Sequence, residues 1–356
     1  MQPRRSPSRR SLRSVSAEAC VGIVANPASG RDIRRLVAGA SVFGNADKAG
    51  MVFRLLAGLG AAGVQRALML PAGDGLSPTL RRQLDRRTGD APFPALEELD
   101  VRLTSTAADT TRAVELMCAR GVEAIAVLGG DGTHRVVAKA CGDVPICALS
   151  TGTNNVFPEM REATVAGIAT GLVATGRGGE HALVREAALV VERDGAPPDL
   201  ALVDVAVTGD RFVGARALWR HEALRELFVA FADPGAVGLS SVAAQLAPMA
   251  RGGGRGLHVC LAQDRGRAEV VLQVALAPGL VTHVAVAGFA PLERGERVAL
   301  APGAGTLALD GEREIERRGE DGATVHLADG PLRIDVDAVM RDAARANATQ
   351  MQPAAG

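Results

Sequence analysis

The stretch 124–133 constrains the fold of this chain more than any other. It begins with the apolar run Ala-Ile-Ala-Val-Leu and continues with Gly129-Gly130-Asp131-Gly132-Thr133. The apolar run predicts a buried strand, and the glycines cannot extend it, so we expect a tight turn there. Thr133 can cap a helix that begins at residue 134. Because glycines let backbone N–H groups come close to an anion, this turn is typical of a phosphate cradle.

Asp131 is the candidate catalytic residue of this turn. A carboxylate that faces phosphate is electrostatically unfavourable unless it has a task, such as accepting or orienting the proton of an attacking hydroxyl. The turn therefore indicates phosphoryl transfer, with Gly129, Gly130, Gly132 and Thr133 as phosphate-binding residues. The plain alternative is a strand-to-helix turn in which Asp131 only accepts hydrogen bonds from backbone amides.

A second turn of this kind follows the first predicted strand, 21–25. Its sequence is Asn26-Pro27-Ala28-Ser29-Gly30, and Pro27 cannot extend the strand. The hydroxyl of Ser29 and the neighbouring amides suit phosphate oxygens, so Asn26, Ser29 and Gly30 are candidate phosphate-binding residues. The alternative is a simple loop between a strand and a helix.

Strand and helix patterns alternate over the first half of the chain. We expect strands over 67–70, 101–103, 124–128 and 145–149, and helices over 47–57, 106–120 and 162–174. This alternation predicts an open parallel Rossmann-like α/β sheet that binds ligands at the carboxyl ends of its strands. Residues 58–63 match G-x-G-x-x-G by letter, but they close a helix, so we reject a dinucleotide fingerprint there.

The polar loop 150–158 follows the strand 145–149 in the same relative position as the glycine turn. It offers hydroxyls and amides without charge, which suits ribose or phosphate oxygens. The candidate nucleotide-binding residues are Thr151, Gly152, Thr153, Asn154 and Asn155. The alternative is a buried turn that satisfies its own hydrogen bonds.

The second half of the chain predicts a mainly β domain. Short strand patterns cover 183–192, 200–207, 257–262, 268–275, 281–287, 298–300 and 306–309, and helices are expected over 221–231 and 240–249. We expect an Arg/Ser-rich disordered tail over 1–19, an α/β domain over 20–158, a β-rich substrate domain over 159–335, and a C-terminal helix and tail over 336–356.

Two acidic positions of the second half are candidate substrate-binding sites. Asp204 lies inside the apolar run 201–207, where a charge is costly unless it has a partner or a task. Asp310-Gly311-Glu312 follows a strand, which makes Asp310 and Glu312 candidates as well. The alternatives are an outward-facing strand residue for Asp204 and a hairpin turn for Asp310-Gly311.

Composition excludes several classes of function. With 40 basic and 40 acidic residues the net charge is zero, so we expect neither nucleic acid nor stable membrane association. No Gly-Lys-Ser/Thr occurs, which rules out a P-loop. The five cysteines lack C-x-x-C pairing and the six histidines lack ligand spacing, so we expect reduced thiols in a cytoplasmic protein without a structural metal.

Taken together, these motifs resemble the NAD kinase and diacylglycerol kinase superfamily. The first strand with Asn26 to Gly30, the glycine turn, Gly152-Thr153-Asn154-Asn155 and Leu309-Asp310-Gly311-Glu312 are similar to the motifs of that family, in its order. Within it, 25–35 and 212–217 resemble the branch called ATP-NAD kinase-like, or acetoin-catabolism protein X. The resemblance implies a two-domain fold, with a β-sandwich-like second domain and an active site in the cleft between the domains.

The resemblance also implies chemistry. Asp131 would serve the acceptor hydroxyl, and ATP with a divalent cation, Mg²⁺, would be the phosphoryl donor to NAD or a related nucleotide. Because lysine is nearly absent, arginine must meet part of the phosphate charge, and Arg216 is the candidate. Val203 stands where NAD kinases usually carry asparagine. Members of the superfamily commonly self-associate, which implies a homo-oligomer.

Two other functions stay open at this point. A lipid alcohol is an alternative acceptor, since Phe228 and Phe231, on a helix expected after His221, could line an apolar groove. The other alternative is a nucleotide-binding accessory protein without turnover.

Overall fold

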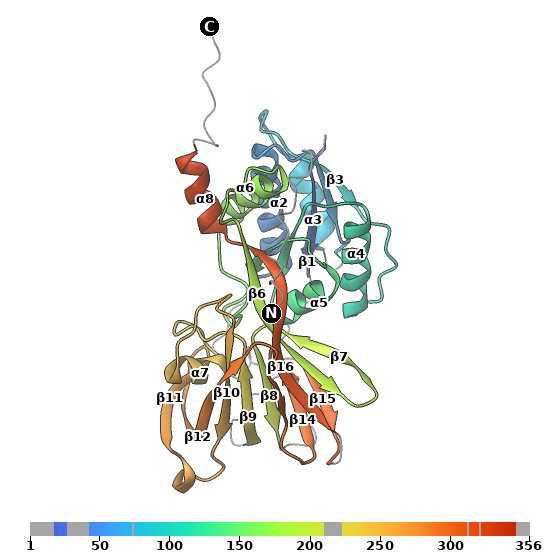
Figure 1. The fold of residues 1–356 in the computed structure, drawn as a ribbon. Coiled ribbons are helices and arrows are strands. Elements are labelled where there is room, and N and C mark those ends of the chain that lie inside the picture. Colours follow the sequence, from blue (N-terminus) through green and yellow to red (C-terminus); the bar gives the residue numbers. More distant parts are fainter. Residues whose placement is uncertain are drawn as a thin grey trace, which may run out of the picture.

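The computed structural model of the chain describes residues 18–26, 43–72, 75–209, 223–311, 313–319 and 322–346. Figure 1 shows a helix-covered α/β half and a β half, as the sequence predicts. Two long strands, β6 (Leu183–Arg193) and β16 (Ala323–Ile334), extend from the α/β half into the β half.

The first sheet has nine strands within the described residues. Its order is β3 (Ala95–Glu98), β2 (Arg66–Met69), β1 (Cys20–Ala25), β4 (Ala124–Gly129), β5 (Ile146–Ser150), β16, β6 and β7 (Ala196–Ala201), and β13 (Arg297–Ala299) pairs with β16. The strands from β3 to β5 are parallel, which confirms the predicted open parallel sheet. β16 continues it in parallel with β5, whereas β6, β7 and β13 are antiparallel additions.

Helices cover both faces of the parallel part of the sheet. One face buries its apolar residues against α2 (Asn45–Ala61), α3 (Leu76–Asp85), α6 (Ala163–Ala174) and α8 (Val336–Arg345). The other face packs against α4 (Ala107–Ala119) and α5 (Asp131–Ala140). Strands buried on both faces read as continuous apolar runs, which is why β1 and β4 were recognisable in the sequence.

The second sheet is antiparallel. Its order is β11 (Val270–Ala277), β12 (Leu280–Glu293), β10 (Arg255–Leu261), β9 (Leu224–Val229), β8 (Asp204–Thr208), β14 (Gly305–Leu309) and β15 (Arg313–Arg317). The short helices are α7 (Ser240–Leu246), which shares a core with this sheet, and the 3₁₀ turn η2 (Arg265–Arg267). Leu189 and Leu327 of the first sheet share another core with Val205 and Leu307 of the second. This stacking is the expected sandwich-like arrangement.

The helix expected over 221–231 is wrong, because Leu224–Val229 forms strand β9. Strand β9 lies between β8 and β10 and pairs with both. Apart from Arg225, its side chains are buried on both faces, so the apolar spacing has no period of two and suggested a helix instead. Phe228 and Phe231, at 0% and 2% exposure, lie in the core and line no helix face.

Two expected strands also differ. Residues 101–103 form no strand, and the strand is β3, Ala95–Glu98, whose half-exposed edge position gives no apolar signal. The strand expected over 200–207 is broken between β7 and β8, since residues 202 and 203 form a bend. The remaining expected strands and helices overlap observed ones.

The predicted domain boundary after residue 158 does not coincide with the division between the two sheets. Helix α6 packs on α2, and β6, β7 and β16 pair into the first sheet, although all four follow that position. No helix in the described part of the chain is long and apolar enough to cross a membrane.

Candidate functional site

The site lies where the parallel sheet changes direction. Strands β1 and β4 are neighbours, but the chain continues from β1 toward β2 and from β4 toward β5 on the opposite side. Ligands of open α/β sheets bind at the carboxyl ends of the strands at such a switch point. Asn26 follows β1, and Gly130 and Asp131 follow β4. The Asn26 side-chain amide donates to the Thr133 hydroxyl at 2.9 Å, so Asn26 contacts the glycine turn, while residues 27–30 of the other predicted turn lie outside the described residues.

Helix α5 begins directly in the glycine turn. Gly130 is its N-cap, with extended backbone angles, and Asp131 is its first residue. Thr133 is therefore not the cap that we expected. It is the third residue of the helix, and its hydroxyl accepts the hydrogen bond from Asn26. A Cβ on Gly129 would lie 2.7 Å from the Thr133 Cβ, and one on Gly130 2.9 Å from the Asn155 Oδ1, so both glycines make room for these side chains.

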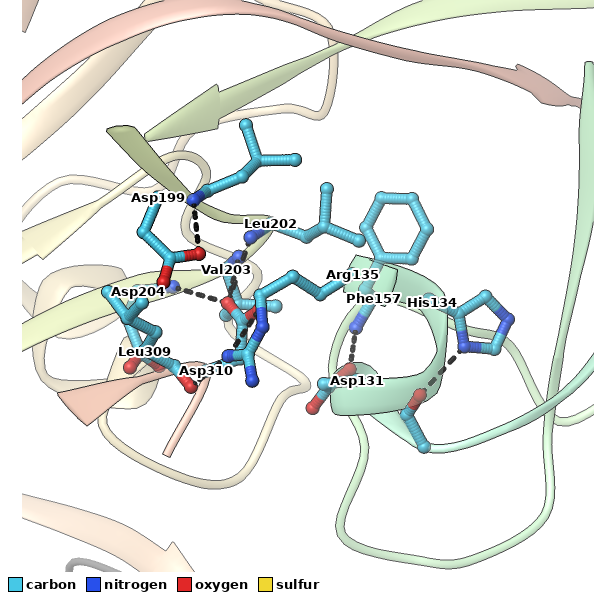
Figure 2. Close-up of polar contacts among 12 residues, drawn as sticks. Asp131, His134, Arg135, Phe157, Asp199, Leu202, Val203, Asp204, Leu309 and Asp310 are labelled. Carbon is cyan, nitrogen blue, oxygen red and sulfur yellow. Dashed lines mark hydrogen bonds and ion pairs between the residues drawn. The ribbon is translucent and has the colours of Figure 1, made fainter. Parts of the chain in front are cut away.

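The Asp131 carboxylate is held by the loop that follows β5. It is 7% exposed and accepts hydrogen bonds from the Phe157 amide at 2.8 Å and the Val156 amide at 3.1 Å. Figure 2 shows Phe157 beside the start of α5, with the bond to Asp131. These bonds match the plain alternative considered for Asp131, but they also fix the direction in which its carboxylate points.

The loop 150–158 satisfies much of its own hydrogen bonding. The Ser150 hydroxyl donates to the Gly152 carbonyl at 2.7 Å, and the Asn155 side chain donates to the Ser150 hydroxyl at 2.8 Å. The Thr151 carbonyl accepts from the Phe43 amide at 3.2 Å. Thr153 is exposed and Asn154 is half-buried. This loop is thus a closed turn that anchors Asp131.

A recess between the two sheets brings three carboxylates together. It measures about 20 Å³, which is room for about one water molecule or one hydroxyl group. Its acidic lining comes from Asp131 of α5, Asp204 of β8 and Asp310 of the turn after β14; Asn154, Val156, Val237, Gly238, Leu239, Leu276 and Gly311 complete it. Four of the predicted site residues, the three carboxylates and Asn154, therefore lie around one space, although they come from separate parts of the sequence.

Asp310 stabilises the bend between β7 and β8 by accepting hydrogen bonds from its backbone amides. Its Oδ1 accepts hydrogen bonds from the amides of Leu202, Val203 and Asp204 at 2.9, 2.8 and 3.3 Å (Figure 2). Its own φ of 52° is left-handed, a conformation that aspartate tolerates in turns. Strands β14 and β15 pair on either side of it, so the hairpin alternative is confirmed and Asp310 has this structural task as well.

Arg135 connects α5 to this turn and was missed in the sequence. Its guanidinium, 6% exposed, donates to the Leu309 carbonyl and lies 3.4 Å from the Asp310 Oδ2 (Figure 2). Burial raises the pKa of the Asp310 carboxyl, whereas Arg135 and the three amides act in the opposite direction. One signal was available, because Arg135 follows Asp131 by four residues and so shares its helix face.

Lys48 is a second missed residue. It is on α2, 1% exposed, and its Nζ donates to the Asn26 carbonyl at 3.0 Å. The apolar spacing of this helix hid it, because a lysine inside such a pattern is normally exposed. A cation therefore lies at the switch point, beside the Asn26–Thr133 pair.

Four predicted site residues, Ser29, Gly30, Arg216 and Glu312, lie outside the described residues. Gly132 is the second residue of α5. Among the residues that the structure describes, no group of three or more His, Cys, Asp or Glu side chains is arranged to hold a metal ion.

Comparison with known proteins agrees with this architecture. Residues 21–177 match the family model of the ATP-NAD kinase N-terminal domain, and residues 187–330 match that of the acetoin catabolism protein X C-terminal domain. Acetoin catabolism protein X of Cupriavidus necator is 49% identical over 332 residues, which cover 91% of this chain and 92% of that protein.

Solved structures similar to this chain include two from Bacillus anthracis. A diacylglycerol kinase aligns with a TM-score of 0.41 and 14% identity, over 89% of this chain and 96% of its own. A putative diacylglycerol kinase aligns with a TM-score of 0.44 and 13% identity, over 89% of this chain and 97% of its own.

The α/β domain with its glycine turn, followed by the antiparallel β domain, defines a class of two-domain proteins with an ATP-NAD kinase N-terminal domain. Within that class, the chain belongs to the family of acetoin catabolism protein X. The resemblance drawn from the sequence motifs is thereby confirmed.

Proposed function

We propose that this protein is an ATP-dependent kinase that transfers a phosphoryl group to a hydroxyl of a small molecule, NAD or a related nucleotide. One observation carries the proposal. The Asp131 carboxylate is fixed at the first residue of α5, at the switch point of the sheet, and faces a recess between the two domains that has room for one hydroxyl group.

The surroundings of α5 suit the phosphates of a nucleotide. The first turn of a helix leaves its amides outside the helical hydrogen bonds, and these amides favour an anion. Lys48 and the Asn26–Thr133 pair lie at the same end of the sheet. Mg²⁺ is commonly held by one or two carboxylates together with substrate phosphates, and Asp204 would offer one carboxylate beside Asp131. When bound, ATP with Mg²⁺ supplies the phosphoryl group.

The protein's own contribution is mainly to position the acceptor. Phosphoryl transfer passes through a loose transition state, so catalysis depends on holding the hydroxyl in line with the phosphorus. Asp131 accepts or orients the proton of that hydroxyl, and the Val156 and Phe157 amides keep its carboxylate in place.

The features that bear on the acceptor are Val203 and two phenylalanines. The Val203 side chain is buried at 1% exposure and has no amide for a dinucleotide, so a related nucleotide is included in the proposal. Phe228 and Phe231 were considered as the lining of an apolar groove for a lipid, but both rings lie in the core. A nucleotide acceptor is therefore favoured over a lipid.

The test is the rate of NADP formation from NAD and ATP with Mg²⁺ by purified protein, compared with Asp131→Asn. Loss of the carboxylate should lower the rate by about 10²- to 10⁴-fold, the usual range for a general base. Asp143→Asn is the matched control: Asp143 is exposed, pairs with Arg185 and is remote from the recess, so it should keep the wild-type rate.

If Asp131→Asn keeps the wild-type rate, the assignment of Asp131 is wrong. If NAD is not phosphorylated, a thermal-shift screen of NAD, NADP, ATP and lipids, followed by turnover assays with each stabilising ligand, identifies the acceptor. Binding without turnover for every ligand would instead favour an accessory protein.

A further inference from the structure

Arg251 of the β half contacts the loop that anchors Asp131. It lies between α7 and β10, and its Nη1 donates to the Phe157 carbonyl at 2.6 Å, while its Nη2 donates to the Val156 carbonyl. Its guanidinium lies 4.4 Å from the ring centroid of Phe231 and 5.8 Å from that of Phe157. The same two loop residues donate their amides to Asp131.

The peptide group between Val156 and Phe157 is therefore held at both ends. Its carbonyl oxygen accepts from Arg251, and its N–H donates to the Asp131 Oδ1. A trans peptide is planar and its C=O and N–H point in opposite directions, so fixing the oxygen also fixes the direction of the N–H. A cation on the oxygen further polarises the peptide and makes the N–H a stronger donor.

We propose that Arg251 is a positioning residue for Asp131: it sets, from the β half, the orientation of the peptide that holds the carboxylate. The role in catalysis rests on the function proposed above. The role in holding the loop does not.

Arg251 is half-buried, and its surroundings support this role. Within the described part of the chain, the direct contacts of its guanidinium are two carbonyls and two aromatic rings, and the charges of Glu186, Glu159 and Asp131 also stabilise it from a greater distance. Burial lowers the pKa of Arg251, and nearby Arg333 acts in the same direction. An arginine that gives up part of its hydration is costly when only packing is needed, since an aliphatic side chain would fill the same space.

The first measurement is amide hydrogen exchange at Val156 and Phe157, which needs no substrate. In Arg251→Met, which keeps the length of the side chain and removes the donors, both amides should exchange at least about tenfold faster than in the wild type. Arg251→Lys keeps the charge over Phe231 but cannot donate to two carbonyls as a fork, so it should be intermediate. If Arg251→Met does not fold, the exchange rates of Arg251→Lys test the proposal in its place.

The second measurement is turnover of NAD with ATP and Mg²⁺. If Arg251 positions Asp131, kcat should fall about tenfold or more in Arg251→Met while the KM for ATP stays within about twofold, and Arg251→Lys should recover part of kcat. A variant that is merely less well folded has fewer active molecules. When rates are expressed per folded molecule, its kcat and its KM for ATP should both equal the wild-type values.

Arg185→Met is the matched control. Arg185 also donates to a main-chain carbonyl, that of Gly330 at 3.1 Å, but it has no contact with the loop 156–157. It should leave the exchange of Val156 and Phe157 at the wild-type rate.

The outcomes distinguish this proposal from the one above. Wild-type exchange of Val156 and Phe157 in Arg251→Met overturns the positioning role, whatever the turnover. Faster exchange with an unchanged kcat overturns its importance for catalysis. A wild-type protein without turnover on any acceptor overturns the proposed function, and the exchange rates then still decide whether Arg251 holds the loop.

Discussion

His134 supports the glycine turn at the scale of a single residue. Its ring is fully buried, its Nδ1 lies 2.8 Å from the Gly130 carbonyl oxygen, and its ring centroid is 5.7 Å from that of Phe157. A carbonyl oxygen only accepts, so the Nδ1 carries the proton in this contact. Burial lowers the pKa of His134 from 6.5 to about 4, so the imidazole is neutral in the folded protein.

This histidine makes stability depend on pH in a defined direction. The unfolded chain binds the proton with a pKa near 6.5 and the folded chain only near 4, so the free energy of unfolding falls as the pH decreases between these values. The difference corresponds to roughly 3 kcal/mol at most. In His134→Gln, which cannot titrate, urea unfolding followed across this pH range should show a shallower loss of stability than the wild type. Equal slopes would contradict the buried neutral ring.

Helices α2 and α6 show what close contact requires at the scale of elements. A Cβ on Gly58 of α2 would lie 2.2 Å from the Thr164 carbonyl oxygen, and one on Gly167 of α6 would lie 2.3 Å from the Leu55 carbonyl oxygen. Gly58, the first glycine of the G-x-G-x-x-G match at 58–63, therefore lets the backbones of two helices come into contact. Helix packing explains Gly58 without any nucleotide.

The prediction compares two glycines of the same helix. Gly58→Ala should lower the free energy of unfolding by about 1–3 kcal/mol, because backbone atoms must move apart to admit the methyl group. Gly50→Ala should raise it by about 0.5–1 kcal/mol, since a Cβ there meets the end of the Arg54 side chain at 3.4 Å and alanine favours the helix. Chemical denaturation measures both. Stabilisation by Gly58→Ala would show that the helices lie farther apart.

The whole molecule is joined by strands that belong to both halves. Strands β6 and β16 pair in the first sheet and extend into the β half (Figure 1). Their buried residues share a core with the second sheet. The Arg333–Glu186 ion pair between these strands is buried, and Arg135 connects α5 to the turn after β14. Separating the halves would expose this shared core to water.

We therefore expect both sheets to unfold together. Calorimetry should give one transition whose calorimetric and van't Hoff enthalpies agree. Gly58→Ala, far from the second sheet, should shift that entire transition to lower temperature. Two transitions, with only one of them moved by Gly58→Ala, would show that the halves unfold independently.

Local sequence determined much of this protein. The apolar runs of β1 and β4 and the glycines after them are short-range signals, because strand propensity and turn geometry depend on neighbouring residues. They predicted the parallel sheet, the turn that carries Asp131 at the carboxyl end of a strand, and the family resemblance. Asp310 was also recognisable as a candidate, since a turn rich in acids follows a strand.

The tertiary structure alone decided which partners these residues have. Arg135 and Leu309 are separated by 174 positions, and Arg251 and Val156 by 95. Strand β9 became a strand because β8 and β10 pair with it on both sides, although its apolar spacing favoured a helix. Contacts between distant segments form only when the core brings them together, so no local pattern records them. The amides that hold Asp131, and the arginine that holds those amides, belong to this second group.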